Sequence, residues 1–556
     1  MTKSSRALAT GVSLTLALLA GIAIAAEPRP TTAPAKAPAV APAAGSTLAT
    51  QESPLGQLPS KDARSLSISA DNRHVAVLRK VSTTVDGKNV DKFIVSVDGK
   101  DQKEYDWIVA NSLTFSADSS ACAYVVQDSK GMYPVIGGVE SKPCFEIVKS
   151  DIFAIPGGKG FAWFAKAKAG GKNYVVINGE DGKEYDEVGN LVFSPDGKHW
   201  AYAVRTGEKM YFLIDSKPTS EYDAVIGASF TWSPDNLHHA FSAIKGKGDG
   251  AKAVVVIDGK EVVEANSAGR VFFSPDSQRT AFVIGDAKSA KIYIDGKEAK
   301  AYDRILSETV RFSPDSKRVA YLAGRAAKGD DKGSTFYVVD GEETRSYEQI
   351  VLNSLMFSPD SKRFAFVVAK DLPGLPADKA KRFQAIIDTL GGAEYEDLRA
   401  AQFSPDSRHF AYLARRSNRT YAVVDNTEGV GYEAVSSLLY SAEGKHMAYI
   451  AFRDKNAFVV LDNIEGPNYQ GIVEGTMSFS PDGRHLAFEA RREKEGDKPG
   501  EKKLIPFFVV DKLETAEHGG SLRGSRIVWD ESSRKLRAII LRDEGKIFLM
   551  DMELPG

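Results

Sequence analysis

A short pattern, an aromatic residue followed by Ser-Pro-Asp, recurs along this chain and limits its possible folds more than any other feature. Its clearest copies begin at Phe193, Trp232, Phe273, Phe312, Phe357, Phe403 and Phe479. Looser copies begin at Ile68, Phe115 and Tyr440, and degenerate ones at Phe153 and Trp529. The twelve starts lie about 42 residues apart on average, and a period of about 40–45 residues is typical of one blade of a β-propeller.

Each repeat contains signals for four short strands. Ser-Pro-Asp predicts a tight turn after the first strand, because Pro presets φ and Asp bonds the local backbone. Ala then follows the motif start by eight residues in ten of the twelve copies, with an aromatic residue next in nine of them. Such a pair suits a strand whose sheet is stacked between two neighbours. Asp-Gly pairs predict a hairpin after the third strand, and we expect the fourth strand to begin near a Tyr, as at Tyr185, Tyr222, Tyr302 and Tyr347.

The sequence therefore predicts an all-β protein, a β-propeller of about twelve four-stranded repeats. Strands without helices between them exclude βαβ folds, and radial repetition leaves few exposed sheet edges. Because propellers usually have four to eight blades, we expect two six-bladed propellers in tandem, over residues 61–306 and 307–556. A division into seven and five, or one oversized ring, stays open. Residues near Leu55–Leu58 are candidates for the strand that the last repeat lacks.

The first 60 residues differ from the repeats. Residues 1–26 are predicted to be a signal peptide, with basic Lys3 and Arg6, an apolar run and the small-residue cleavage pattern Ala23-Ile24-Ala25. An uncleaved membrane anchor is the alternative. Residues 27–60, rich in Pro and Ala, are predicted to be a linker. The expected location is therefore periplasmic or secreted, with no stable membrane insertion after cleavage.

Charge and cysteine content exclude several classes of protein. The chain has 72 Lys and Arg against 74 Asp and Glu, a net charge of −2, which argues against nucleic acid as the main partner. Two Cys exclude a disulfide-rich scaffold and a multi-Cys metal cluster. Cys122 and Cys144 fall on strands two apart in one predicted sheet, about 9.6 Å from each other, which disfavours a disulfide between them.

The repeated Phe-Ser-Pro-Asp-Gly/Ser, followed by Ala-Tyr, resembles the WD-repeat-like propeller repeats of the TolB type. The resemblance covers about residues 61–556. It implies a propeller fold and partner binding in the cell envelope. TolB has an α/β domain before its propeller, whereas this chain has the Pro/Ala-rich segment there. The Trp-Asp pair of true WD repeats occurs only at Trp529-Asp530.

Residues able to carry chemistry mostly coincide with the repeat itself. Six His lie six positions after a motif start: His74, His199, His238, His409, His446 and His485. Other repeats have Arg there, as at Arg279, Arg318 and Arg363, so the slot is interpreted as structural rather than metal-binding. The Asp of each turn is interpreted as a turn former.

Catalytic motifs are absent from the sequence. Gly519-Gly520-Ser521-Leu522-Arg523 lacks the last Gly of a nucleophile elbow, and neither a phosphate-binding Gly-rich loop nor His-Glu-x-x-His occurs. We therefore predict no catalytic, cofactor-binding or metal-binding residues, and no cofactor.

Four long polar loops between second and third strands, residues 243–252, 324–334, 370–382 and 491–503, are candidate binding loops, or solvated insertions without a role. The predicted function is an exported, non-catalytic propeller that binds or scaffolds a protein or cell-envelope partner. The alternative is a hydrolase or lyase that acts on carbohydrate or peptide in the central channel.

Overall fold

The computed structural model describes residues 48–58, 66–85, 88–286, 289–327, 333–372, 374, 381–496, 498, 500–530 and 532–554. All of them belong to one compact unit, residues 41–556. The predicted signal peptide and residues 27–47 of the predicted linker lie outside these ranges. The helices found within them are three 3-10 turns, Val148–Ser150, Gly248–Gly250 and Asp543–Gly545. No helix among the described residues is long and apolar enough to cross a membrane.

The described strands form twelve antiparallel sheets. Eleven are each built from one sequence repeat, and the twelfth combines the last repeat with β1 from the start of the described chain. In the first to sixth sheets the strands are β2 (Leu66–Ile68), β3 (Val75–Val85), β4 (Lys88–Val97), β5 (Lys100–Tyr105); β6 (Thr114–Phe115), β7 (Cys122–Asp128), β8 (Gly131–Ile136), β9 (Val139–Glu140); β10 (Glu146–Ile147), β11 (Phe153–Ala154), β12 (Phe161–Lys166), β13 (Asn173–Ile177), β14 (Glu180–Asp181); β15 (Glu187–Phe193), β16 (Trp200–Thr206), β17 (Lys209–Ile214), β18 (Lys217–Pro218); β19 (Ala224–Trp232), β20 (His239–Lys245), β21 (Lys252–Ile257), β22 (Lys260–Ala265); and β23 (Ser267–Ala268), β24 (Phe272–Phe273), β25 (Thr280–Gly285), β26 (Ala290–Ile294), β27 (Lys297–Glu298).

In the seventh to twelfth sheets they are β28 (Arg304–Phe312), β29 (Val319–Arg325), β30 (Ser334–Val339), β31 (Glu342–Glu343); β32 (Gln349–Ile350), β33 (Met356–Phe357), β34 (Phe364–Asp371), β35 (Lys381–Ile387), β36 (Leu390–Tyr395); β37 (Asp397–Phe403), β38 (Phe410–Arg416), β39 (Arg419–Val424), β40 (Thr427–Glu428); β41 (Ala434–Tyr440), β42 (Met447–Arg453), β43 (Asn456–Leu461), β44 (Ile464–Glu465); β45 (Gly471–Ile472), β46 (Ser478–Phe479), β47 (Leu486–Glu495), β48 (Lys502–Val510), β49 (Leu513–Glu514); and β50 (Val528–Asp530), β51 (Lys535–Leu541), β52 (Lys546–Glu553), β1 (Thr50–Gln57).

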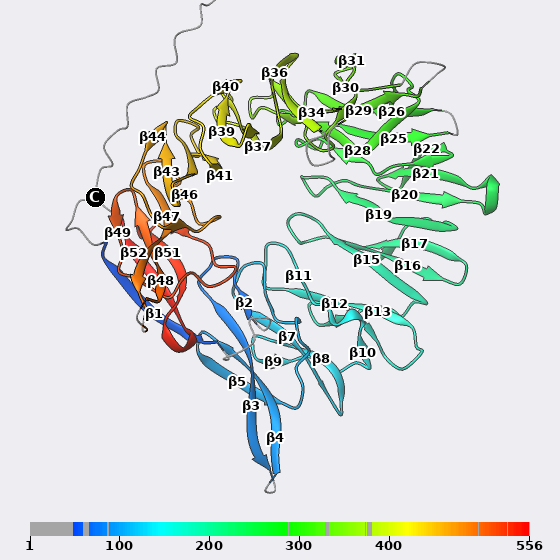
Figure 1. The fold of residues 1–556 in the computed structure, drawn as a ribbon. Coiled ribbons are helices and arrows are strands. Elements are labelled where there is room, and N and C mark those ends of the chain that lie inside the picture. The colour runs from blue at the N-terminus through cyan, green and yellow to red at the C-terminus, as the bar shows by residue number, and fades with distance from the viewer. Residues whose placement is uncertain are drawn as a thin grey trace, which may run out of the picture. The chain divides into compact units, whose positions relative to one another are not determined.

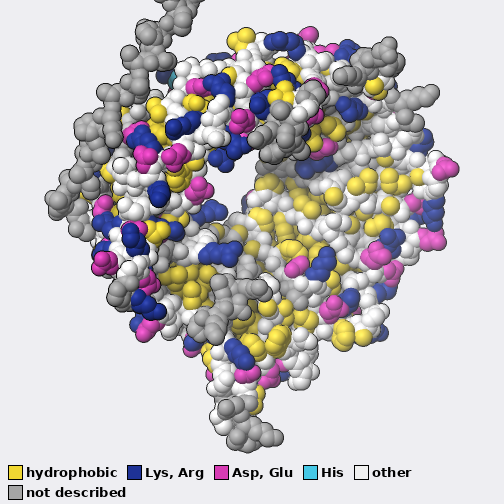
Figure 2. Space-filling view, viewed as in Figure 1, with side chains coloured by type: hydrophobic (Ala, Val, Ile, Leu, Met, Phe, Trp, Pro, Cys, Tyr) yellow, Lys and Arg dark blue, Asp and Glu magenta, His cyan; other side chains and the backbone are white. Residues whose placement is uncertain are grey.

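The sheets follow one another in a closed ring. In Figure 1 the first strands, such as β15 and β19, lie nearest the centre, and Figure 2 shows an opening there. β1 pairs with β52 along the outer edge of the twelfth sheet, so both ends of the described chain contribute to one sheet. Leu55 and Ile539 of this sheet share a core with Val75 and Val77 of the first sheet, which closes the ring.

The predicted division into two six-bladed propellers near residue 307 is not confirmed. Two separate rings need contacts between the sixth sheet and the first, and between the twelfth and the seventh. Instead, Ile292 of the sixth sheet packs in one core with Tyr321 and Phe336 of the seventh, and the twelfth sheet packs on the first. Twelve sheets in one ring is the arrangement that the sequence left open.

One strand prediction is confirmed and one needs correction. The segment around Leu55 completes the last sheet as predicted: Thr50–Gln57 form strand β1 inside the segment predicted to be a linker, because they pair with β52 and bury Leu55. The fourth strand was expected to begin near a Tyr. It begins directly after the hairpin turn, as at Glu342, and the Tyr lies at its far end, where Tyr347 bridges back to Thr335.

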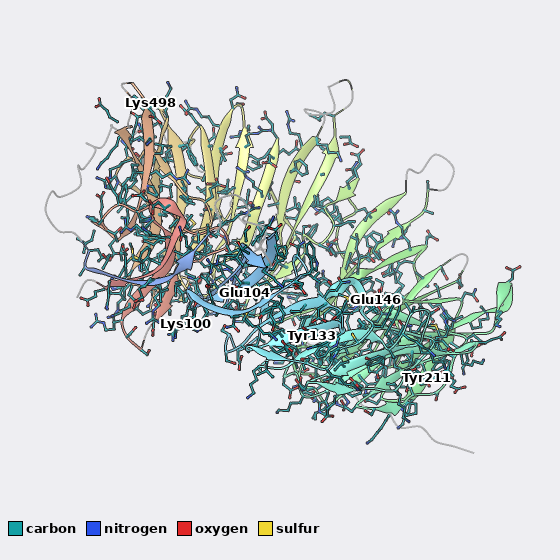
Figure 3. All side chains as sticks on the ribbon, turned by 90° about the horizontal axis from the view of Figure 1, so that it is seen from below. Lys100, Glu104, Tyr133, Glu146, Tyr211 and Lys498 are labelled. Carbon is teal, nitrogen blue, oxygen red and sulfur yellow. The ribbon has the colours of Figure 1, made fainter. Side chains whose placement is uncertain are left out.

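The Ala-aromatic pair of the second strand faces two different neighbours, as predicted. In the ninth sheet, Tyr412 packs toward the eighth sheet and Ala411 toward the tenth. Successive side chains of a strand point to opposite faces, so neither face of the sheet is left to solvent. Figure 3 shows the sheets from below, with Tyr133 of the second sheet and Tyr211 of the fourth labelled.

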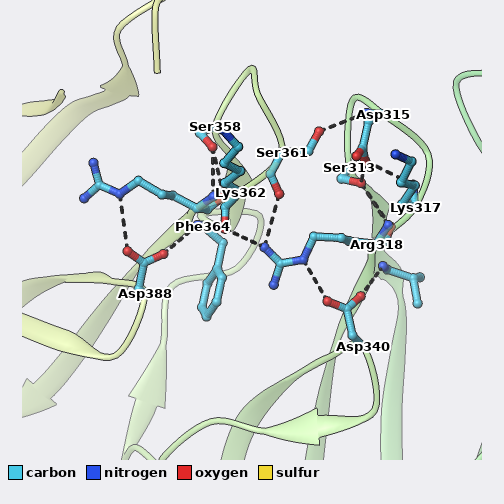
Figure 4. A network of polar contacts seen from close by, with 12 residues as sticks. Ser313, Asp315, Lys317, Arg318, Asp340, Ser358, Ser361, Lys362, Phe364 and Asp388 are labelled. Carbon is cyan, nitrogen blue, oxygen red and sulfur yellow. Dashed lines mark hydrogen bonds and ion pairs between the residues drawn. The ribbon is translucent and has the colours of Figure 1, made fainter. Parts of the chain in front are cut away.

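The Ser-Pro-Asp turn is held by side-chain hydrogen bonds within and between sheets (Figure 4). Ser313 Oγ donates to Asp315 Oδ1 over 2.6 Å and accepts the Arg318 backbone N–H. Ser361, from the turn of the next sheet, accepts the Asp315 backbone N–H over 2.9 Å. The repeated Ser and Asp thus act as turn formers, and a further Ser joins one turn to the next.

Candidate binding clefts between the outer strands

A Tyr-Glu hydrogen bond, called here the latch, ties the outer edges of five pairs of neighbouring sheets. The Tyr at the end of one fourth strand donates to the Glu at the second position of the next sheet's fourth strand. The O–O distances run from 2.8 to 3.2 Å in the pairs Tyr105–Glu140, Tyr222–Glu261, Tyr302–Glu343, Tyr395–Glu428 and Tyr432–Glu465. The latch lies at the rim of the ring, where neighbouring sheets diverge.

Cations complete each latch. Glu343 accepts bonds from Lys300 Nζ at 2.7 Å and from Arg325 at 2.6 and 2.8 Å. These cations, Lys300 first, lower the pKa of Glu343 to about 2 from its usual 4.5. Burial, with the Glu343 carboxylate beside it, raises the pKa of Tyr302, so the phenol stays protonated and donates. The latch is therefore a neutral donor bound to an ionised acceptor.

Between the second and third sheets the latch is missing. Cys144 stands where other sheets have Tyr, since it bridges to Met132 as Tyr302 does to Ala290. Without the ring, a cavity of about 710 Å³ opens there. We call it the 2/3 cleft, and its lining includes Asp128–Gly131, Lys142–Phe145, Ala167, Tyr174, Asp181, Gly182 and Glu184. Phe145 is 51% exposed, unusual for a large apolar side chain.

Between the third and fourth sheets the acceptor is missing. Tyr185 is present, but Pro218 occupies the position of the latch Glu, opposite Leu213 as Glu343 is opposite Val338. A second cavity, of about 400 Å³, lies here. We call it the 3/4 cleft, and it is lined by Val175, Ile177, Asn178, Glu180–Lys183, Tyr185, Trp200, Tyr202, Leu213 and Ser216. The two clefts share Asp181 and Gly182, so they flank the outer edge of the third sheet.

The apolar core between the third and fourth sheets is also small. Among the described residues it has four buried apolar side chains, whereas most other interfaces have nine to twelve. The interface of the fifth and sixth sheets, where Ala265 replaces the latch Tyr, also has four. Figure 2 shows hydrophobic side chains gathered at the surface over this side of the ring, around β12, β15 and β19.

Aromatic packing replaces the latch at two other interfaces. Tyr469 has no hydrogen bond to Glu514, but its ring lies 5.8 Å from the rings of both Phe488 and Phe507. Tyr347 lies 5.6 Å from Phe366 of the next sheet. At these two interfaces the Tyr therefore contacts the next sheet through its ring rather than through a hydrogen bond.

The six repeated His lie in contacts within their own sheets. Each His Nδ1 lies 2.7–2.8 Å from the Asp of its own hairpin, in pairs His74–Asp98, His199–Asp215, His238–Asp258, His409–Asp425, His446–Asp462 and His485–Asp511. The guanidinium groups of Arg279, Arg318 and Arg363 occupy the same slot and lie over the motif Phe of the next sheet at 5.3–5.7 Å. No group of three metal-ligating side chains occurs among the described residues.

The two Cys are free and buried on opposite faces of the second sheet, which explains why they do not pair. Cys122 lies in the core with the first sheet and Cys144 in the core with the third. Burial raises the pKa of Cys122 to about 12 and that of Cys144 to about 11, so neither is a thiolate at neutral pH.

Ser521, of the segment that comes closest to a nucleophile elbow, belongs to an inter-sheet contact. Its Oγ donates to Glu489 Oε2 of the eleventh sheet, and its backbone N–H donates to Oε1. Burial raises the pKa of Glu489. His518 Nδ1 is occupied by the Gly520 N–H, and burial lowers the pKa of His518 to about 4. Ser521 also bridges to Ile540 within a sheet rather than lying on a strand-to-helix turn.

The clefts were not predicted from the sequence. The predicted binding loop 243–252 forms a hairpin extension, and loops 324–334, 370–382 and 491–503 lie partly outside the described residues. The sequence did contain a usable signal: Cys144 and Pro218 interrupt two positions that hold Tyr and Glu or Asp in most repeats. Without the register between sheets, those two positions could not be related to each other.

Comparison with known proteins does not identify a family. No family model and no curated protein matches the chain, so the TolB-type family is not confirmed. Solved structures that are similar in part include a eukaryotic initiation factor, at 13% identity over 68% of this chain and 90% of that one, with a TM-score of 0.33. The propeller of the trilobed protease of Pyrococcus furiosus is 14% identical over 50% of this chain and 91% of that one, with a TM-score of 0.24. The Dos1 propeller is 11% identical over 60% of this chain and 93% of that one, with a TM-score of 0.24.

The latch predicts a pH dependence of stability. Because the folded pKa of Glu343 is lower than its unfolded value, this group stabilises the fold above about pH 4.5, and the contribution is lost as the pH falls toward 2. We expect Glu343→Gln to flatten the loss of unfolding free energy between pH 5 and pH 2, measured by urea denaturation. Glu342→Gln, on the same strand but without an ion pair to any described residue, is the control. Equal slopes for both variants and the wild type would contradict this role.

Restoring the missing acceptor is expected to close the 3/4 cleft. Pro218→Glu places a carboxylate at the latch position opposite Tyr185, and we expect a coupling of about 0.5–1.5 kcal/mol between them, the net value of one hydrogen bond. Unfolding free energies of Pro218→Glu, Tyr185→Phe and the double variant measure it. A coupling of zero would show that Tyr185 is not positioned to form a latch.

Proposed function

We propose that this protein is a non-catalytic binding or scaffold module that recognises a protein partner at the 2/3 and 3/4 clefts. The observation that carries the proposal is the opening of two adjacent clefts where latch residues are replaced. Ligand pockets commonly measure about 300–1,000 Å³, and both clefts fall in this range. The repeated His, Ser and Asp side chains described above are already engaged in turns and inter-sheet contacts.

The location of the protein follows from its first residues and is part of the same proposal. The basic start, apolar run and Ala-Ile-Ala pattern of residues 1–26 support export, and the protein is then periplasmic or secreted. Partners are accordingly envelope or extracellular proteins, consistent with the TolB-type resemblance of the repeats.

Site-specific photocross-linking in intact cells tests the proposal. A photoreactive amino acid at Phe145, in the 2/3 cleft, is expected to give a discrete cross-linked product. The same substitution at Leu390, which is 70% exposed on the outer strand β36, is the control and is expected to give none. Adding Cys144→Tyr, which fills the 2/3 cleft, is expected to abolish the product at Phe145.

Two results would overturn this function. One is an identical pattern of products at both positions, which indicates contact by collision. The other is turnover of a defined oligosaccharide or peptide by the purified protein, which favours the hydrolase or lyase alternative.

A further inference from the structure

The 3/4 cleft has an aromatic wall of a kind that suits one class of partner. Trp200 and Tyr202 of β16 lie stacked, with ring centroids 5.4 Å apart and planes 14° apart. Tyr185 lies beside them and meets Tyr211 edge to face at 6.4 Å. Val175, Ile177 and Leu213 form the floor. Trp200 and Tyr185 are half-buried, so part of each ring is available to a ligand.

We propose that the 3/4 cleft binds a proline-rich, basic segment of a partner protein in the polyproline II conformation. The inference rests on the proposed function and names the partner segment that this cleft accepts. Proline rings pack on flat aromatic side chains, and an extended polyproline helix loses little conformational entropy on binding. Grooves lined by Trp and Tyr are the usual docking surface for such segments.

Charge at the rim supplies the second part of the argument. Residues 178–187 contain five carboxylates, Glu180, Asp181, Glu184, Asp186 and Glu187, and a single cation, Lys183. Asp181, Asp186 and Glu187 are paired with Lys142, Lys172 and Arg205. Glu180 and Glu184 have no cationic partner among the residues that the structure describes. They stand on the third sheet's outer edge, and an Arg or Lys flanking the prolines is their complement.

The backbone at the rim also admits a close approach. Gly182 lies at the shared edge of the two clefts, where an added Cβ would lie 2.8 Å from the Val175 carbonyl oxygen and 3.3 Å from the Tyr202 hydroxyl. Because Gly182 has no side chain, the edge of the third sheet does not cover the Tyr202 ring. The Tyr185 hydroxyl has no latch Glu to donate to and, among the described residues, is hydrogen-bonded only to the Tyr211 side chain. A ligand carbonyl, which an extended proline-rich backbone presents toward its surroundings, can replace Tyr211 as its acceptor.

Binding of a labelled peptide to the purified full chain tests the inference. The probe is the fluorescein-labelled peptide APPLPPRK, followed by fluorescence anisotropy at low and moderate salt. We expect saturable binding that is weakened by salt, since the Glu180 contact is exposed. Two comparison peptides, APPLPPEE without the basic flank and AGGLGGRK without the prolines, are expected to bind at least tenfold more weakly.

Variants of the chain locate the site. Trp200→Ala is expected to raise the Kd at least tenfold, as for an aromatic hot spot, and Pro218→Glu to raise it by closing the cleft. Glu180→Lys, an exposed change that keeps the fold intact, is expected to raise it severalfold. Glu342→Lys, at the equivalent position of the latched seventh sheet, is the matched control and is expected to leave the Kd unchanged.

The outcomes separate this inference from the proposed function. Equal binding of AGGLGGRK, no binding of APPLPPRK, or the same effect from Glu180→Lys and Glu342→Lys overturns the proline-rich partner. A cross-linked product at Phe145 in the same protein then leaves the binding function standing. If neither a cross-linked product nor peptide binding is observed, both the proposed function and the proline-rich partner are overturned.

Discussion

The whole structure depends on packing between neighbouring sheets. One repeat of about 42 residues makes a four-stranded sheet with two apolar faces, and no such sheet can cover both faces by itself. In nine of the twelve repeats the second strand therefore places Ala on one neighbour and an aromatic ring on the other, as in the ninth sheet. This chain meets the requirement for all twelve sheets by closing the ring, where β1 completes the last sheet and packs it against the first.

Two kinds of side-chain contact join neighbouring sheets, one near the turns and one at the outer rim of the ring. Near the turns of nine sheets, the Asp of the hairpin holds a His or Arg, and this side chain contacts the aromatic residue of the next sheet in cases such as His199, His238 and Arg318. At the rim, where neighbouring sheets are farthest apart, the Tyr-Glu latch and its cations hold the edges together. At two interfaces where a latch residue is replaced, by Cys144 and by Pro218, the rim is open locally. The 2/3 and 3/4 clefts are such local openings, which gives a rigid scaffold with a distinct site.

Much of this architecture could be predicted from the sequence. The period, the Ser-Pro-Asp turn and the Ala-aromatic pair specify strands and the faces that they bury, because these are local signals. The structural role of His238 and Arg318 followed from their exchange at one repeat position. The single ring could not be predicted, because cores of the same composition suit six sheets or twelve. The clefts were also missed, since Cys144 and Asp181 lie 37 positions apart in the sequence and become neighbours only through inter-sheet register.

Amide hydrogen exchange on the wild-type protein tests most directly whether the latches hold the outer edges. The third sheet has no latch on either side, and the ninth has one on both. The backbone hydrogen bonds of the two sheets are otherwise matched, at 2.8–3.0 Å. In the third sheet the Gly182 amide donates to Val175 and the Tyr185 amide to Asn173. In the ninth sheet the Gly429 amide donates to Ala422 and the Tyr432 amide to Thr420. The account predicts faster exchange at Gly182 and Tyr185 than at Gly429 and Tyr432. Equal protection of the two pairs would contradict it.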